Sequence, residues 1–333
     1  MLPAAAPAPR LTANDRCWCG SGAKYKRCHG DVRTLQRPPV EAGRVAPMRP
    51  VPATIARPDY VTGGRVGTAR GPQVHDADGV ARMRRAGAVA AEVLTRACAA
   101  AGPGVTTDEL DAIAHAAYVE LGAYPSTLGY NGYPKSICTS VNGVLCHGIP
   151  DDRPLADGDI VNIDVTAFVD GVHGDTSATV CVGDVPQVLR DLVDTTRAAT
   201  LLGIAAIRPD QPLQLVAAAI EPFARSRGYA VVREYGGHGI GVTFHAAPHV
   251  SHHLDRRDGT VLRRGMTLTV EPMLLTGGPR FVTAADGWTE RMADHMPTAQ
   301  FEHTVLVTDD GAEIMTLTEG GRSPAGTLAE LAA

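Results

Sequence analysis

The strongest constraint in this 333-residue sequence is the stretch DIVNIDVTAFVDGVHGDTSATV, residues 159–180. Two apolar segments flank Asp170-Gly171, a dipeptide that favours a two-residue hairpin turn. With the turn at these residues, facing positions sum to 341, so Asp164 and Asp175 lie diagonally on one face. Diagonal partners are roughly 7 Å apart, which lets two carboxylates reach a common cation. A solvated polar sheet face is the other interpretation of the hairpin taken by itself.

The bulk composition is that of a globular chain. Hydrophobic residues make up 44% and charged residues 20% of it, enough for a sizeable core in one large or two modest domains. No apolar run approaches the roughly 20 residues that span a bilayer, and MLPAAAPAPR lacks the features of a signal peptide. We therefore expect a cytoplasmic protein, a monomer, with no membrane contact.

The first 70 residues differ from the remainder. They hold 12 Lys or Arg against 4 Asp or Glu, and nine of the 24 prolines. The whole chain has a net charge of -5, so the remainder carries -13 by difference. We predict a small module at 1–30, a flexible, Pro/Arg-rich linker at 31–70 and a large folded domain at 71–333. A basic arm favours a polyanionic partner such as nucleic acid, and a solvated linker is an equally good interpretation.

Cysteine usage indicates metal binding rather than disulfides. Three of the seven cysteines, Cys17, Cys19 and Cys28, cluster in DRCWCGSGAKYKRCHG and are followed by His29. An odd count in a chain of this size does not fit a disulfide framework. Three thiolates and an imidazole are a ligand set that suits a tetrahedral structural zinc ion.

The order of elements indicates an α+β fold with an internal duplication. Asp76 caps a helix that we expect over 77–101, and Thr106 with Glu109 forms a capping box at the start of the next. Asn142-Gly143 predicts a hairpin within residues 135–149. Further helices are expected near 187–207 and 213–228, and strands within 229–235, 265–274, 298–307 and 312–318. Two helices followed by strands occur twice, without a repeat at the residue level.

Three more candidate ligands lie in the second half. His238 stands among four glycines in YGGHGIG, a loop that cannot bury a core histidine well. Glu271 and Glu302 lie in otherwise apolar strand segments, TLTVEPM and TAQFEHTVLV. With Asp164 and Asp175 they make four carboxylates and one imidazole, which balance two divalent ions better than one. The hard ligands favour manganese, iron or cobalt, with zinc also acceptable.

These residues resemble the bacterial type I methionine aminopeptidases, members of the pita-bread fold shared with prolidase and creatinase. The resemblance covers residues 76–320 through GYPKSICTSVNGVLCHGIPDD, NIDVTAFVDGVHGDTS, GGHGIG, FHAAPHV, VEPM and AQFEHT. It implies a dinuclear site in which Asp175 and Glu302 bridge both ions. Asp164 would bind one ion, and His238 with Glu271 the other.

The resemblance also implies catalytic roles and a substrate pocket. Glu271 would accept a proton from the attacking water, His245 would hydrogen-bond the peptide carbonyl oxygen, and His147 would face the departing nitrogen. The methionine pocket would comprise Tyr130, Tyr133, Cys138, Phe244 and Trp288. Asn131 and Thr127 depart from the commoner residues, histidine and cysteine, and we expect them to tune the pocket edge. No role is assigned to His252, His253 or His295.

The N-terminal stretch resembles the SEC-C motif, which occurs in a preprotein translocase motor ATPase and before some methionine aminopeptidases. The resemblance implies one structural zinc held by Cys17, Cys19, Cys28 and His29. Lys24, Lys26 and Arg27 would be displayed on this knuckle, and we hypothesise that it docks the enzyme on the ribosome.

The resemblance implies removal of the initiator methionine from nascent proteins with a small second residue. Two alternatives are weighed against it: an Xaa-Pro-type aminopeptidase of the same fold, and a ribosome-docking adaptor built on an inactive peptidase fold. The complete ligand set is evidence against the adaptor.

Overall fold

The computed structural model describes residues 12–31, 35, 37–64, 66–67, 71–255 and 257–332. Among these residues no helix is long and apolar enough to cross a membrane. The helices are α2 (Ala77–Ala100), α3 (Thr107–Glu120), α4 (Gln187–Ala205) and α5 (Gln214–Ser226), with short 3-10 turns η1 (Tyr25–Arg27), η2 (Asp59–Val61), η3 (Tyr130–Gly132) and η4 (Leu328–Ala332).

The strands of the described residues form one large and two small sheets. Their bounds are β1 (Tyr124–Pro125), β2 (Cys138–Val141), β3 (Val144–Cys146), β4 (Ile160–Val169), β5 (Val172–Cys181), β6 (Ala230–Val231), β7 (Gly237–Gly239), β8 (Ala246–Val250), β9 (Thr267–Val270), β10 (Met273–Leu275), β11 (Phe281–Thr283), β12 (Glu290–Met292), β13 (Thr298–Gln300), β14 (Glu302–Val307) and β15 (Ala312–Ile314). The large sheet has the order β1-β4-β5-β14-β9-β7-β8, with β2 on β4 and β15 on β14. The small sheets are β13-β10-β6 and β11-β12-β3.

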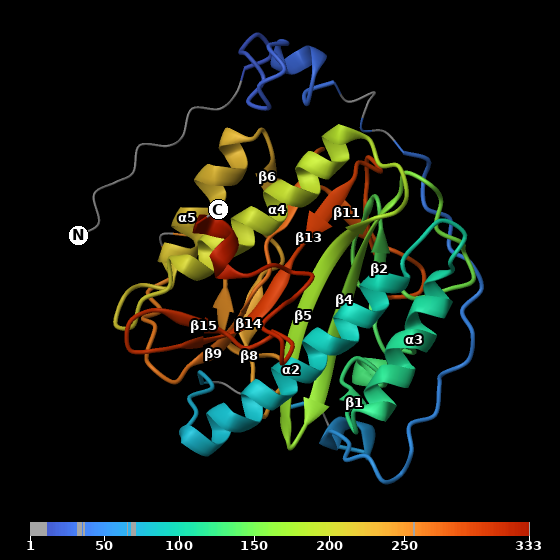
Figure 1. Cartoon of the computed structure of the whole chain (residues 1–333), viewed down its shortest axis with the longest axis vertical. Helices are drawn as coiled ribbons and strands as arrows, with labels where there is room; N and C mark the ends of the chain where they lie inside the picture. Colours follow the sequence, from blue (N-terminus) through green and yellow to red (C-terminus); the bar gives the residue numbers. More distant parts are fainter. Residues whose placement is uncertain are drawn as a thin grey trace.

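The predicted helices and their caps are confirmed. Asp76 accepts a hydrogen bond from Gly79 N at the start of α2, and Thr106 and Glu109 form the capping box of α3. Helix α2 lies across β4 and β5 (Figure 1). Buried side chains of α2 to α5 belong to the main core. Each half of the fold therefore places two helices over its part of the sheet.

The aspartate hairpin has the predicted register. Val169 faces Val172, Thr166 faces Asp175 and Asp164 faces Ser177. Asp170 and Gly171 both have positive φ, 51° and 81°, as a type I′ turn requires. The two carboxylates are thus diagonal neighbours, and the strand on which each lies sits inside the sheet rather than at its edge.

The hairpin predicted around Asn142-Gly143 is wrong. The chain does turn there, with φ of 52° at Asn142, but β2 pairs with β4 and β3 pairs with β12. The ten-residue β4 offers a long edge, along which β1 and β2 pair in succession. Strand β3 does not pair with β2 and belongs to the small sheet that contains β12.

Two other predicted strands are each broken next to a glutamate. The segment 265–274 divides into β9 and β10 at Glu271-Pro272, because proline cannot donate a hydrogen bond to a strand ladder. The segment 298–307 divides into β13 and β14 at buried Phe301. In both cases the chain passes from one sheet to another, and the glutamate lies at the crossing.

Residues 43–60 of the predicted linker lie along the domain predicted for residues 71–333. Gly43 N donates to Asp151 at 2.6 Å, Val51 and Ile55 are buried, and the Tyr60 hydroxyl donates to Ser126 O at 2.5 Å. Arginine content suggested a solvated arm, but arginines of this segment pair with aspartates of the domain. Hydrogen bonds and apolar contacts therefore hold it in place.

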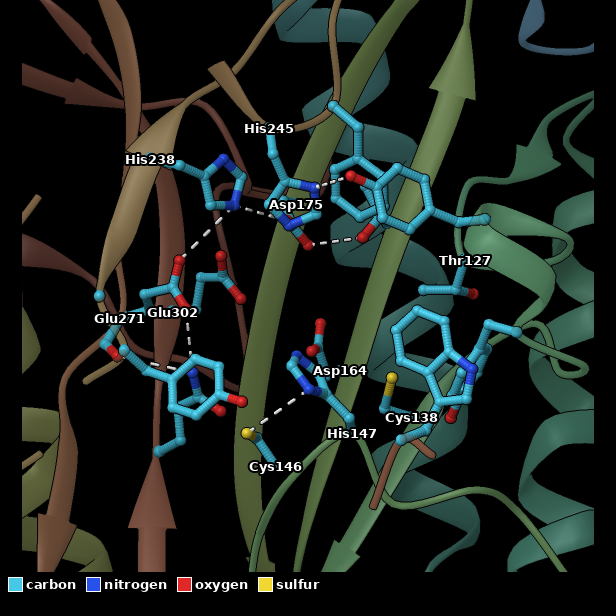
Figure 2. Close-up of a pocket in the computed structure, with 18 of the residues that line it drawn as sticks. Thr127, Cys138, Cys146, His147, Asp164, Asp175, His238, His245, Glu271 and Glu302 are labelled. Carbon is cyan, nitrogen blue, oxygen red and sulfur yellow. Dashed lines mark hydrogen bonds and ion pairs between the residues drawn. The ribbon is translucent and has the colours of Figure 1, made fainter. Parts of the chain in front are cut away.

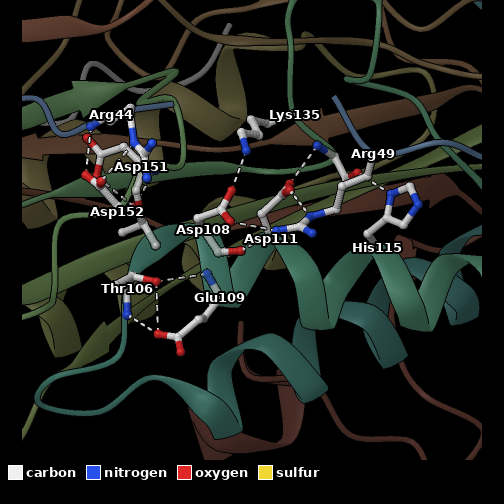
Figure 3. A network of polar contacts seen from close by, with 12 residues as sticks. Arg44, Arg49, Thr106, Asp108, Glu109, Asp111, His115, Lys135, Asp151 and Asp152 are labelled. Atoms are coloured by element: carbon white, nitrogen blue, oxygen red, sulfur yellow. Dashed lines mark hydrogen bonds and ion pairs between the residues drawn. The ribbon is translucent and has the colours of Figure 1, made fainter. Parts of the chain in front are cut away.

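Arg49 enters a polar network beside α3 (Figure 3). Its guanidinium donates to Asp108 at 2.7 Å and to Asp111 at 3.1 Å. Asp108 also pairs with the ammonium of Lys135, whose side chain is fully buried, and Ser136 N donates to Asp111 at 2.7 Å. Burial raises the pKa of Asp111, although these partners lower it. The network joins the arm, α3 and the segment that leads into β2.

We predict that Arg49→Ala lowers the free energy of unfolding by about 1–3 kcal/mol, because it leaves the buried Asp111 short of a charged partner. Arg44→Ala is the matched control, since Arg44 also pairs with an aspartate but is 89% exposed; its effect should stay within about 0.5 kcal/mol. Urea unfolding measures both. Equal losses for the two variants would contradict the assignment.

Candidate active site

A pocket of about 280 Å³ opens above the middle of the large sheet. Figure 2 shows its acidic side chains and histidines turned toward one another. Every candidate residue predicted for the catalytic domain lines it: Tyr130, Tyr133, Cys138, His147, Asp164, Asp175, His238, Phe244, His245, Glu271, Trp288 and Glu302. Residues more than 170 positions apart in the sequence therefore meet in one cavity.

The acidic cluster is built by neighbouring strands. Asp164 and Asp175 come from β4 and β5, His238 from β7 and Glu302 from the start of β14, while Glu271 follows β9 directly. Asp175, His238 and Glu302 offer ligand atoms that lie within 4.8 Å of one another. His238 Nε2 is 3.6 Å from both Asp175 Oδ2 and Glu271 Oε1. Asp164 lines the same pocket without belonging to this closest group.

The buried carboxylates of the cluster repel one another, and bound cations would offset this repulsion. Burial, followed by the neighbouring carboxylates, raises the pKa values of Asp164 and Glu302 well above their ordinary range. Burial also raises the pKa of Glu271 to about 7, although His238 and Thr269 act in the other direction. Four carboxylates and one imidazole in one pocket are a donor set for hard divalent ions, which would remove this repulsion. The residues present thus fit the metal centre that the sequence predicts.

Neutral side chains fix the carboxylates from behind. Thr166 Oγ1 donates to Asp175 at 2.7 Å, Thr269 Oγ1 to Glu271 at 2.7 Å and Gln300 Nε2 to Glu271 at 3.2 Å. Gln300 and Thr269 belong to the strands broken beside the two glutamates. The breaks thus let residues of two sheets converge on one carboxylate.

His245 and His147 stand at different edges of the pocket (Figure 2). His245 Nδ1 lies 2.9 Å from the Tyr130 hydroxyl, and its ring centroid is 4.2 Å from that of His238. The residue is exposed to the pocket, yet desolvation by its surroundings, followed by the nearby histidines, lowers the pKa of His245 well below its ordinary value. Burial lowers the pKa of His147, which Glu290 partly opposes, so both rings are neutral at neutral pH.

The wall opposite the acids is aromatic and contains sulfur. Tyr133 is 2% exposed and packs edge-on against Trp288 at 5.1 Å, next to Cys138. Thr127 and Asn131, the two departures, line the same pocket, and Asn131 adopts a left-handed φ of 46°. Cys146, Tyr235 and Met273 also line the pocket, and the sequence analysis did not predict them as pocket residues.

Three further residues support the pocket without any signal in the sequence. His252, to which the sequence assigned no role, is 1% exposed and accepts a hydrogen bond from Glu271 N at 3.0 Å. Burial lowers the pKa of His252 to about 3, so its ring is neutral and can accept this hydrogen bond. Buried His173 stacks on Phe244 at 5.3 Å. Tyr60 of the arm packs edge-on against Tyr130 at 5.3 Å. No local motif marks these contacts, because the partners are far apart in sequence.

A second ligand cluster lies in the N-terminal module. Cys17, Cys19, Cys28 and His29 offer four atoms within 4.8 Å of one another. Cys17 Sγ is 3.1 Å from His29 Nδ1, and the sulfurs of Cys19 and Cys28 are 3.5 Å apart. Three soft thiolates and one imidazole at these separations fit a tetrahedral zinc ion. The whole predicted set is therefore brought together.

The fold and the acidic pocket define a metal-dependent hydrolase, and comparison with known proteins specifies which. The model of metallopeptidase family M24 matches residues 81–309, and the SEC-C motif matches residues 14–31. The chain therefore belongs to metallopeptidase family M24 and, within it, to the methionine aminopeptidases.

The relatives that carry this assignment match over most of the chain. "Methionine aminopeptidase 2" of Mycobacterium tuberculosis is 50% identical over 84% of this chain and 98% of its own length. "Methionine aminopeptidase 1D, chloroplastic/mitochondrial" of Arabidopsis thaliana is 44% identical over 87% and 83%. A crystal structure of methionine aminopeptidase from Rickettsia prowazekii has a TM-score of 0.72 and 44% identity, covering 74% of this chain and 100% of that one. Prolidase from Pyrococcus furiosus, 22% identical with a TM-score of 0.60 over 74% and 66%, shares the pita-bread fold.

We predict that the affinity of the protein for Mn²⁺ falls as the pH drops below 7. Glu271 has a pKa of about 7 in the metal-free protein, against 4.5 ordinarily, so the ion must displace a proton below pH 7. Each proton displaced costs up to about tenfold in affinity per pH unit. The rise in Tm with added Mn²⁺, measured from pH 5 to 8, checks this.

Taking the difference between metal-loaded and metal-free protein cancels the contribution of distant groups. Glu302→Gln should abolish the Mn²⁺-dependent rise in Tm, whereas Asp194→Asn, which changes a carboxylate on the exposed side of α4, should leave it unchanged. A stabilisation by Mn²⁺ that does not vary with pH would be evidence against the buried carboxylates as its ligands.

Proposed function

We propose that this chain removes the initiator methionine from nascent proteins whose second residue is small. One observation carries the proposal: the acidic cluster, the two neutral histidines and the sulfur- and aromatic-lined wall all face one pocket of about 280 Å³. A pocket of this composition accepts an unbranched thioether beside a metal-dependent hydrolytic centre. The names of the relatives support the same activity.

Asp164, Asp175, His238, Glu271 and Glu302 would hold two divalent ions, which could be manganese, iron, cobalt or zinc. Such a pair lowers the pKa of a shared water to near neutrality and so supplies the attacking oxygen. Glu271 would act as the general base that takes a proton from the attacking water, and the hydrogen bonds from Thr269 and Gln300 to its carboxylate support this role.

His245 would stabilise the charge that develops on the peptide carbonyl oxygen. Burial raises the pKa of Tyr130, whose hydroxyl therefore stays protonated and can donate to His245 Nδ1 at 2.9 Å. The proton of the neutral ring is then on Nε2, from which it can donate to the carbonyl oxygen. His147, in the left-handed region with φ of 55°, would face the departing amide nitrogen.

Tyr133, Cys138, Phe244, Trp288 and Tyr130 would surround the methionine side chain, with Thr127 and Asn131 at its edge. An Xaa-Pro-type aminopeptidase is not favoured, since prolidase is 22% identical while the methionine aminopeptidase relatives are 41–50% identical. An inactive adaptor is not favoured either, because the acidic cluster is complete.

The same proposal places the protein in the cytoplasm, as a monomer acting on N-termini with a free amine. It keeps the division into a zinc motif at 1–30, a linker at 31–70 and a catalytic domain at 71–333. Cys17, Cys19, Cys28 and His29 would hold one structural zinc, and exposed Lys24, Lys26 and Arg27 would contact the ribosome.

The activity is tested by release of methionine from Met-Ala-Ser and Met-Lys-Ser peptides by metal-stripped protein, before and after addition of manganese, iron(II), cobalt or zinc. We expect metal-dependent cleavage of the alanine peptide and at least about 100-fold less of the lysine peptide, a typical discrimination for a sterically closed site. Ala-Pro peptides serve as the control for the alternative activity. Absence of cleavage by folded, metal-loaded protein would overturn the proposal.

Ribosome contact is tested by co-sedimentation of the full chain after Lys24, Lys26 and Arg27 are changed together to Ala. Removal of about three phosphate contacts should weaken binding at least tenfold at physiological salt and reduce its salt dependence. A triple change of exposed catalytic-domain arginines, Arg84, Arg257 and Arg264, is the matched control. Equal binding by both variants would overturn the assignment of this surface.

A further inference from the structure

His29 has partners on both sides of its ring. Nδ1 faces the thiols, 3.1 Å from Cys17 Sγ and 3.4 Å from Cys28 Sγ. Nε2 lies 2.6 Å from Oδ2 of Asp191, on helix α4 of the catalytic domain. The His29 side chain is 4% exposed and that of Asp191 17%. One ring nitrogen is thus available to a metal, while the other is held by a carboxylate 162 residues away.

Aromatic side chains pack around the hydrogen bond between His29 and Asp191. The Trp18 ring lies 4.5 Å from His29 and 6.4 Å from Tyr229, and the guanidinium of Arg227 lies over it at 4.6 Å. The Tyr25 hydroxyl donates to Gly228 O at 3.3 Å. Gly228 needs its φ of 82°, and a Cβ there would meet Tyr25 Oη at 2.3 Å. The module therefore rests on α4 and on the turn between α5 and β6.

A carboxylate behind a metal-ligating histidine has a known effect. It fixes the tautomer and the orientation of the ring and raises its basicity as a ligand. Asp191 is itself held, since Gln187 Nε2 donates to its other oxygen at 2.9 Å. We propose that Asp191 is a positioning residue of the N-terminal zinc site, so that the catalytic domain completes that site and zinc in turn holds the module on α4.

This arrangement gives the module two distinct sides. Trp18, Tyr25 and His29 face the catalytic domain, whereas Lys24, Lys26 and Arg27 are exposed. The module is then a docked part of the enzyme with a fixed orientation, rather than a domain on a free tether. The inference does not rest on the proposed peptidase activity, because the contacts lie away from the active-site pocket.

The test measures metal affinity of the cysteine site in the full chain. Cobalt(II) is added to metal-free protein, and thiolate-to-cobalt absorption, which carboxylate ligands do not produce, reports this site separately from the active site; zinc competition then gives the zinc affinity. We expect Asp191→Asn and Asp191→Ala to lower it about 10- to 100-fold, the usual effect of losing such a partner. Asp194→Asn, on the exposed side of the same helix and paired with Arg197 at 3.5 Å, should match the wild type.

A second readout tests docking itself. Amide hydrogen exchange in residues 15–30 should be faster in zinc-loaded Asp191→Ala than in zinc-loaded wild type, and it should be unchanged in Asp194→Asn. Methionine release should stay near the wild-type level in all three variants. Wild-type zinc affinity and exchange in both Asp191 variants would overturn the inference, as would the absence of thiolate-to-cobalt absorption in the wild type.

Discussion

The structure depends on holding four carboxylates together in a buried pocket, where their mutual repulsion has to be compensated. Burial disfavours the charged forms of Asp164, Glu271 and Glu302, so the site is stable in the ionised state only with cations. This demand explains why the ligands lie on interior strands of a large sheet. A sheet positions side chains from distant segments within a few ångströms, and its hydrogen-bonded ladder resists the spreading that repulsion favours.

The elements around the sheet fix its shape and its contents. Helices α2 to α5 cover it, and the breaks at Pro272 and Phe301 pass the chain between sheets where Glu271 and Glu302 are needed. The N-terminal arm is part of the same construction. It ties α3 to the segment before β2 through Arg49, and Tyr60 packs behind Tyr130, which holds His245. The arm thus supports the substrate side of the pocket, although it contributes no metal ligand.

Local signals predicted the parts of the fold that short-range chemistry decides. The Asp170-Gly171 turn determined the register of β4 and β5, and the capping residues determined where α2 and α3 begin. Predictions were less successful where the outcome depends on which distant strand or side chain a segment contacts. The segment around Asn142-Gly143 looks like a hairpin, but the free edge of β4 pairs with β2 instead. The arm looks flexible because its composition is basic and proline-rich, yet the aspartates that it contacts lie more than fifty residues away.

By itself, the sequence determined which residue types could form a metal centre, the diagonal pair Asp164 and Asp175, and the soft ligand set of the N-terminal module. The tertiary structure decided which distant groups surround those residues. His252 behind Glu271, His173 behind Phe244 and Asp191 behind His29 follow from no motif. The physical reason is that a ligand set is encoded by short spacings, whereas the groups that orient it are brought near by the packing of the whole chain.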